Sequence, residues 1–329
     1  MSTNHSLNVL KFFSAFAVIC THTINWHNGQ IPLIIIELST FAVPVFFLIS
    51  GFYSYYENNS KANQKYKTRS IKLIKLIIIS NLLYLFASFE VMSNLFAQHY
   101  QIMLSKLPSI PQFLVFNLGT YGHLWFIGSL LYCYILFIIL LKLNVKPKKL
   151  YKFIPVLLLS NIILGEIFKC IGIVLPCHYY RNFFFTGLPF FMLGHLIHDK
   201  YNEIIPKISN KQILFSLIFI IPLFIIEGLI VNMWVDLYLG SIFLSLLLFI
   251  YCVKNPTALN LKVIGWIGGN LYTYIYILHP LIIIFIKKFN FKFDYLFPIE
   301  TLIFTIIVSY IIYLVIYKVE INYCIYNKP

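Results

Sequence analysis

The sequence predicts an all-α, polytopic membrane protein: a bundle of about ten transmembrane helices that forms a single domain over residues 1–329. Two observations lead to this fold class. First, 60% of the residues are hydrophobic and 11% are charged, whereas soluble domains average about 45–50% apolar and about 25% charged residues. Second, the apolar residues gather in runs long enough to cross a bilayer. The composition therefore argues against a soluble enzyme, a disordered chain or a small disulfide-held secreted domain.

A helix needs about 20 consecutive, mostly apolar residues to cross the hydrocarbon core. Ten runs meet this requirement, and we expect each to form one transmembrane helix. Their approximate ranges are 8–27, 34–54, 73–93, 119–141, 152–172, 182–199, 213–233, 236–253, 263–286 and 299–318. The longest stretch between them, at about 94–118, is too short for a separate soluble domain. Any chemistry must therefore take place inside the helix bundle or at its edge.

The positions of Lys and Arg predict the orientation of the bundle. If the N-terminus lies in the cytoplasm, 19 of the 25 Lys and Arg residues fall on the cytoplasmic side of ten spans and six on the outer side. Cytoplasmic loops of membrane proteins carry this excess of basic residues. Both termini are therefore expected in the cytoplasm. The net charge of +14 then mostly sets topology, and we expect membrane lipids rather than nucleic acid as partners.

The six cysteines indicate neither a metal site nor a disulfide framework. They are scattered along the chain, and none forms a Cys-x-x-Cys pair or a Cys/His cluster with metal-ligand spacing. No metal is expected, and the thiols are interpreted as packing groups.

Ionisable residues inside membrane spans are costly to bury, so they are candidates for function. The first span carries Lys11 and His22, which are eleven residues apart and therefore share a helix face about 16 Å apart along the axis. Either the pair has a function, or the lysine reaches the membrane surface and the histidine is bonded to a neighbouring helix. Glu37 starts the second span at a similar depth. It either orients the imidazole of His22 or faces the outer water layer.

The second span contains the run VPVFFLISGF from Val43 to Phe52. Pro44 frees a backbone carbonyl within the helix. Ser50 and Gly51 permit close approach by another helix, and close packing alone would explain the glycine.

Basic and imidazole side chains also mark the expected cytoplasmic edge. Arg69 and Lys72 are three residues apart at the start of the third span, so they share one helix face. Such a pair suits a ligand that bears phosphate, but it equally suits anionic lipid headgroups. His195 and His198 at the end of the sixth span are expected to face water or headgroups.

Three spans place polar and aromatic side chains in the outer half of the bundle. The fourth span opens with His123 and Trp125, and the sixth begins at Arg181. The ninth carries His279 on the same face as two tyrosines. His22, His123 and His279 are thus expected at one depth, which does not by itself place them in contact. Trp125 is equally explained as an interface anchor.

In this order, the motifs resemble those of the integral-membrane acyltransferase family 3. The matching segments are Lys11-x10-His22, Val43 to Phe52, Arg69-x-x-Lys72, His123 to Phe126, Arg181 to Gly194, and Asn270-Leu271 followed by Tyr276, His279 and Pro280. The resemblance covers nearly the whole chain. Lys11 and Lys72 stand where the family has arginine, so the charge is kept but the bidentate fork is lost.

This resemblance implies an enzyme that moves an acyl group, often acetyl, from acyl-CoA to a hydroxyl of a cell-surface polysaccharide or of its lipid-linked precursor. The enzyme would lie in the inner or plasma membrane, with acetyl-CoA as donor substrate and no permanently bound cofactor. His22 would act as general base or carry the acyl group covalently, with Glu37 beside it. The residues expected to hold CoA are Lys11, Ser50, Arg69 and Lys72, and those expected to hold the acceptor are His123, Trp125, Arg181 and His279.

Two other functions stay open at this point. The chain could be a transporter or binding module for a small amino acid such as serine, or for a glycan, without acyl transfer. The stretch from Arg181 to Gly194 also resembles membrane segments associated with a fused racemase, although no racemase domain is present. A degenerate member kept for assembly with a partner enzyme is the third possibility, supported by the two lysines that replace arginine.

Overall fold

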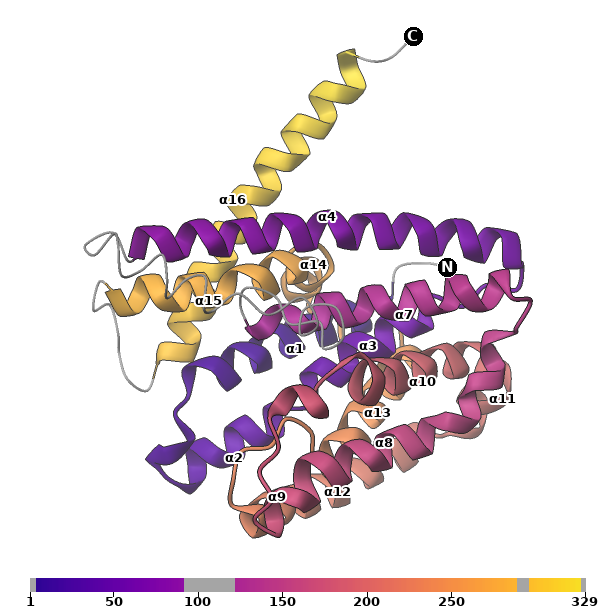
Figure 1. The fold of residues 1–329 in the computed structure, drawn as a ribbon, viewed down its shortest axis with the longest axis vertical. Helices are drawn as coiled ribbons and strands as arrows, with labels where there is room; N and C mark the ends of the chain where they lie inside the picture. Colours follow the sequence, from indigo (N-terminus) through magenta and orange to yellow (C-terminus); the bar gives the residue numbers. More distant parts are fainter. Residues whose placement is uncertain (1–3, 92–121, 289–295, 327–329) are drawn as a thin grey trace.

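The computed structural model describes residues 4–91, 122–288 and 296–326. Every regular element in these ranges is a helix, which confirms the all-α class (Figure 1). The predicted connection at 94–118 lies outside the described residues. The α-helices are α1 (His5–Thr23), α2 (Gln30–Ser39), α3 (Ala42–Phe52), α4 (Asn59–Val91), α7 (Trp125–Lys142), α8 (Ile154–Ile162), α9 (Phe168–Cys170), α10 (Leu188–Asp199), α11 (Tyr201–Ile204), α12 (Asn210–Val231), α13 (Leu239–Lys254), α14 (Lys262–Asn270), α15 (Tyr272–Lys288) and α16 (Phe297–Tyr326).

The predicted number of ten spans is not confirmed. Helical segments lie at all ten predicted ranges, but within the described residues five are long and apolar enough to cross a membrane by themselves. They are Gln30–Phe52, Gly122–Lys142, Pro147–Cys170, Asn210–Val231 and Phe297–Ile316. The pair α14 and α15 adds a sixth if its 80° bend is counted within one span. Other helices at the predicted ranges are shorter, such as α13 with 16 residues, so the count of ten spans stays a prediction. The side of the membrane on which the termini lie also stays a prediction.

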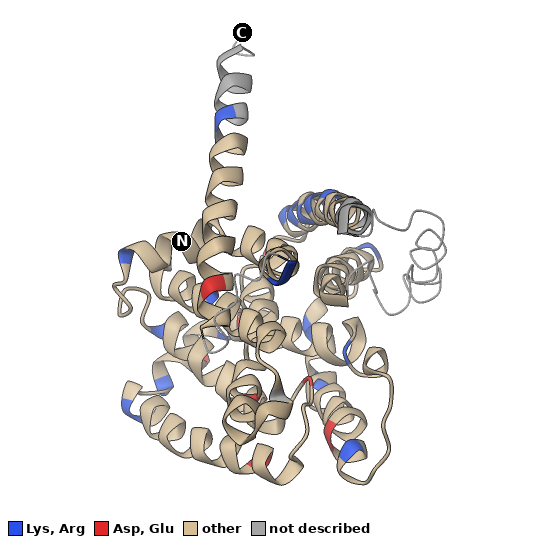
Figure 2. Cartoon of the chain, turned by 90° about the vertical axis from the view of Figure 1, so that its left-hand side faces the viewer, with Lys and Arg blue, Asp and Glu red and all other residues tan. Residues whose placement is uncertain are grey.

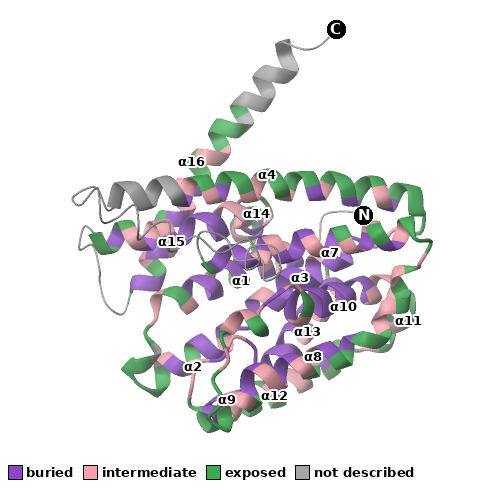
Figure 3. Ribbon diagram, viewed as in Figure 1, coloured by how far each residue is buried: buried purple, intermediate pink, exposed green. Residues whose placement is uncertain are grey.

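Apolar side chains cover much of the outer surface of the bundle. On α12, Leu214, Phe215 and Ile218 are each more than 60% exposed. Figure 3 shows exposed residues along α4 and α12 around a buried centre, and Figure 2 shows few charges over the body of the bundle. A soluble monomer rarely exposes apolar patches of this extent, whereas lipid accommodates them. The protein is therefore a membrane protein, as its composition predicts.

Two helices cross closely at a pair of glycines. A Cβ on Gly51 of α3 would overlap the carbonyl of Phe191 in α10, and a Cβ on Gly194 of α10 would overlap the carbonyl of Leu48 in α3. Each glycine thus lets the backbone of the other helix approach, which is how small residues join membrane helices. The close approach predicted at Gly51 is confirmed.

Helix α1 lies at the centre and contacts α2, α3, α13, α14, α15 and α16. It begins where the side chain of Asn4 accepts a hydrogen bond from the Leu7 amide at 2.8 Å, an N-cap that satisfies one free donor of the first turn. It ends at Thr23, after which Ile24 is extended. Helix α1 thus carries Lys11 and His22 through the middle of the bundle.

Candidate active site

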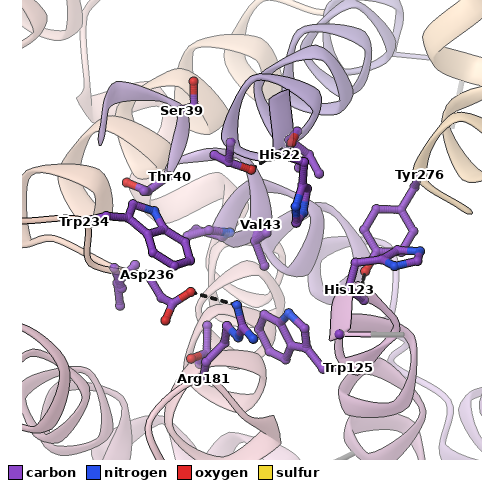
Figure 4. Close-up of a pocket in the computed structure, with 16 residues that line it drawn as sticks. His22, Ser39, Thr40, Val43, His123, Trp125, Arg181, Trp234, Asp236 and Tyr276 are labelled. Carbon is purple, nitrogen blue, oxygen red and sulfur yellow. Dashed lines mark hydrogen bonds and ion pairs between the residues drawn. The ribbon is translucent and has the colours of Figure 1, made fainter. Parts of the chain in front are cut away.

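A cavity of about 200 Å³ opens at the end of α1 that carries His22 (Figure 4). Its other walls come from the corner between α2 and α3, the start of α7, the segment around Arg181, the connection between α12 and α13, and Tyr276 of α15. We call it the His22 cavity. Six segments of the described chain therefore meet at one ionisable side chain.

The last turn of α1 presents His22 to this cavity. The hydroxyl groups of Thr21 and Thr23 donate to the carbonyls of Val18 and Ile19 in the same helix, at 2.7 and 2.8 Å. These bonds give the hydroxyl protons of both threonines an acceptor within their own helix. His22 itself is an exposed residue, so its imidazole is accessible to a molecule that enters the cavity.

Three histidine rings meet at this end of the bundle. The ring centroids of His22 and His279 are 5.2 Å apart, and those of His123 and His279 are 5.4 Å apart. Nδ1 of the buried His279 lies 3.2 Å from the carbonyl oxygen of Ile275. A carbonyl only accepts hydrogen bonds, so Nδ1 carries the proton and Nε2 is the acceptor nitrogen. The three histidines, which were expected at one depth, thus also pack together, with His279 in contact with both His22 and His123.

His123 and His279 have different positions relative to the cavity. His123 lines it together with Tyr276, whose hydroxyl donates to the His123 carbonyl. His279 is fully buried and is not among the lining residues of the described chain. It therefore contacts His22 and His123 rather than the cavity itself.

An ion pair crosses the wall opposite the histidines. Nη1 of Arg181 lies 3.0 Å from Oδ1 of Asp236, with 21% and 11% of the two side chains exposed (Figure 4). Nη2 of Arg181 also contacts Sγ of Cys177 at 3.2 Å, and the guanidinium lies 5.8 Å from the centre of the Trp125 ring. Arg181 and Trp125 are thus in the cavity, as the sequence predicts.

Local sequence explains how Arg181 is held. The side chain of the next residue, Asn182, accepts from the amides of Phe184 and Phe185 and so caps the π-helical turn Phe183–Gly187 that leads into α10. The capped turn fixes the backbone beside the arginine.

Sequence reasoning missed Asp236 and Trp234. Both lie in the short connection between α12 and α13 and both line the His22 cavity. No motif marks them. The available signal was that Asp236 is a lone acidic residue between two strongly apolar runs, which is the pattern expected of a functional or paired charge.

Glu37 is not part of the His22 cavity. Its carboxyl group is fully buried against Gly228 of α12, where a Cβ on that glycine would overlap it. Glu227 and Glu166 lie near it, and Glu227 accepts from the amides that open α13. Helix α2 turns Glu37 towards α12 rather than α1, so the expectation that it orients His22 is not met. Among the described residues, the carboxylate that lines the cavity with His22 is that of Asp236.

A second cavity of about 80 Å³ lies towards the other end of α1, and we call it the Lys11 cavity. Lys11 and Ser50 line it, as do the rings of Phe126 and Tyr272. The Lys11 ammonium lies 3.2 Å from Oδ1 of Asn8 and 4.9 Å from the centre of the Tyr272 ring. Two of the four residues expected to hold CoA, Lys11 and Ser50, therefore line one cavity.

Tyr276 lines both cavities. Its ring packs against Phe126 at a centroid distance of 5.3 Å, and Phe126 in turn packs against Phe46 at 5.9 Å. Tyr276 is thus a wall that the Lys11 cavity and the His22 cavity share, and we call its ring, with Phe126 packed against it, the partition.

Arg69 and Lys72 do not line the Lys11 cavity. The Arg69 guanidinium donates to Ser54 Oγ at 2.8 Å and to the Tyr53 carbonyl at 2.9 Å, with Tyr134 and Tyr56 hydroxyls at 3.2 and 3.4 Å. It therefore ties the connection between α3 and α4 together. Lys72 is exposed. Both residues lie on α4 as expected, and their binding of a phosphate-bearing ligand stays a prediction.

The expectation that His195 faces water or headgroups is wrong. His195 is 5% exposed, and its Nδ1 lies 2.6 Å from the Tyr151 hydroxyl. His198 is only half-buried, and its Nδ1 lies 2.6 Å from the Phe52 carbonyl. Both imidazoles fill space between α10 and its neighbours, a packing that hydropathy alone does not indicate. Across residues 4–91, 122–288 and 296–326, no group of His, Cys, Asp and Glu is arranged to hold a metal ion.

Comparison with known proteins gives one match. A family model described as an acyltransferase domain, that of acyltransferase family 3, matches residues 4–318. No curated protein and no solved structure matches the chain. The matched range includes all the residues that line the two cavities.

Proposed function

The chain belongs to acyltransferase family 3, and from that membership we propose that it moves an acetyl or other short acyl group from acyl-CoA to a hydroxyl of a cell-surface polysaccharide or of its lipid-linked precursor. The reaction would be an O-acetylation in the inner or plasma membrane. CoA would be a substrate that leaves after each turnover.

The observation that carries the proposal is the pair of cavities joined at Tyr276. Lys11 and His22 lie eleven residues apart on α1, about 16 Å along the axis, and each lines its own cavity. A cationic cavity on one side and an imidazole on the other suit a polyanionic donor and a neutral nucleophile. The reacting atoms would meet at the partition.

The Lys11 cavity is proposed as the donor end. Lys11 is the one basic residue among the described residues that line this cavity, and a lysine binds phosphate or a polarised carbonyl as a point charge. Ser50 adds a hydroxyl on the same wall. This end would face the cytoplasm, where CoA is found and where the basic loops are predicted to lie.

His22 is proposed as the general base. Its imidazole takes the proton of the acceptor hydroxyl, and the oxygen attacks the thioester carbonyl carbon. The carbon–sulfur bond then breaks, and the CoA thiolate receives the proton from the imidazolium. His279 would hold the ring of His22, and the ion pair of Asp236 and Arg181 lines the opposite wall of the cavity. An acyl-imidazole formed on His22 would serve the same transfer in two steps.

Mass spectrometry of surface glycans tests this function. Strains that express the wild-type chain, the His22→Ala variant or no chain are compared, with His27→Ala as matched control because His27 is exposed and does not line the cavity. We expect an acetyl mass on the glycan only with the wild type and His27→Ala. Unchanged glycan acetylation by His22→Ala at equal protein levels would contradict the role of His22. Ligand uptake without any acyl donor would instead favour a transporter.

A further inference from the structure

We propose that the acceptor that enters the His22 cavity is an uncharged, hydroxyl-rich sugar ring, and that Asp236 excludes acidic sugars by neutralising Arg181. This inference rests on the proposed function for its acyl transfer, but it concerns which sugar the cavity holds. Its argument comes from the charges, the hydrogen-bonding groups and the size of the cavity.

The charges of the cavity cancel. Of its lining residues in the described part of the chain, Arg181 and Asp236 are the two with a full charge at neutral pH, and they lie 3.0 Å apart. Nη1 and Nη2 of Arg181 already contact Asp236 and Cys177. A carboxylate ligand that reached the remaining N–H groups would lie beside the negative charge of Asp236. An acidic sugar would therefore meet a paired arginine and a negative carboxylate.

The lining hydroxyl groups can only accept. Each hydroxyl group has one proton, and all five donate it to a backbone carbonyl. Thr21 donates to Val18, Ser39 to Ile35, Thr40 to Glu37 and Thr186 to Tyr180, at 2.7 to 2.9 Å, and Tyr276 donates to His123. Their remaining capacity is lone pairs, and the Asp236 carboxylate adds more. Sugar hydroxyl groups supply protons to such acceptors, whereas an ionised carboxylate has none to give.

The apolar walls suit the face of a sugar ring. Trp125 and Trp234 both line the cavity, on either side of the ion pair (Figure 4). Indole rings offer flat apolar surface against which the C–H face of a pyranose packs. A volume of about 200 Å³ is below the roughly 300–1,000 Å³ of sites for drug-sized ligands. The cavity therefore accommodates one ring or the end of a chain.

Binding of matched sugars tests this inference independently of acyl transfer. Purified full-length protein is titrated with methyl glucoside against methyl glucuronide, and with methyl galactoside against methyl galacturonide, and binding is followed by tryptophan fluorescence. Acetyl transfer to the same sugars is measured in parallel. We expect the neutral sugar of at least one pair to bind at least about tenfold more tightly, because placing like charges together costs several kcal/mol.

Asp236→Asn keeps the shape of the side chain and removes its charge. We expect it to shift the ratio of neutral to acidic binding by about tenfold towards the acidic sugar, since Arg181 then lacks its counter-charge. Asp236→Glu should keep the wild-type preference and shows whether the position tolerates change. Glu203→Gln is the matched control, because Glu203 is an exposed carboxylate paired with Lys200.

The outcomes separate the two proposals. Equal or tighter binding of the acidic sugars, no binding of any of the four sugars, or an unchanged ratio in Asp236→Asn would overturn the neutral-sugar inference even if acyl transfer occurs. Preferential binding of the neutral sugar without any transfer would support the inference and contradict the proposed acyltransferase function.

Discussion

The imidazole ring of His22 lies 5.2 Å from that of His279. The two residues come from opposite ends of the sequence, on α1 and α15. His22 is exposed to its cavity while His279 is fully buried and donates from Nδ1 to a carbonyl of its own helix. One ring is thus free to react while the other is held in a fixed orientation behind it.

Replacing His279 is expected to lower turnover without weakening donor binding. His279→Ala removes the ring that packs against His22 and His123, so the general base loses its orientation. We expect kcat to fall by about tenfold or more, while the KM for acyl-CoA stays unchanged. Steady-state kinetics in detergent measures both. A rise in KM with normal kcat would place His279 in donor binding instead.

Tyr276 is expected to control what crosses between the cavities. Tyr276→Ala removes the ring shared by the two cavities and the hydrogen bond to the His123 carbonyl. The widened passage should admit water and longer acyl chains, so acyl-CoA hydrolysis without acceptor should rise relative to transfer. Release of free CoA thiol measures this. Tyr276→Phe keeps the ring and serves as control; if both variants release CoA as slowly as the wild type, the ring is not a partition.

Lys11 is expected to bind the donor. Lys11→Ala should raise the KM for acetyl-CoA by about tenfold, because a charge-assisted contact contributes about 1.5–3 kcal/mol. Lys11→Arg keeps the charge and should retain donor binding. Lys61→Ala is the matched control, since Lys61 is exposed at the start of α4. An unchanged KM in Lys11→Ala would show that the Lys11 cavity does not hold CoA.

Arg69 is expected to act on stability rather than on donor binding. Arg69→Ala removes bonds to Ser54, Tyr53, Tyr134 and Tyr56, which should lower the free energy of unfolding by about 2–3 kcal/mol. Thermal unfolding in detergent gives the loss of stability, and KM for acetyl-CoA is measured on the folded fraction. A raised KM at normal stability would restore Arg69 to the CoA site.

Composition and motif spacing were enough to predict the helical class and the close approach at Gly51, but not the central position of α1. The spacing of Lys11 and His22 predicted their shared helix correctly, because a helix fixes distance along its axis. The sequence also placed His123, Trp125 and Arg181 at one end of the bundle, where the structure joins them in the His22 cavity.

The sequence did not predict which neighbouring helix each side chain faces. Glu37 has the depth of His22 but faces α12, and Arg69 bonds to the loop before its own helix. The depth of a residue in the membrane can be predicted from its position in an apolar run, and its charge from its residue type. The face that a helix turns to each neighbour depends on packing. Asp236 was not predicted to lie in the site because its partner, Arg181, is 55 residues away in the sequence.

The most direct test of the account is transfer across a sealed membrane. Proteoliposomes carry isotopically labelled acetyl-CoA on the side of the Lys11 cavity and a neutral glycoside on the side of the His22 cavity, with the orientation of the chain determined by protease accessibility. The account predicts labelled, acetylated glycoside with the wild type and His27→Ala, and none with His22→Ala. Transfer that requires both substrates on the same side, or that persists in His22→Ala, would contradict it.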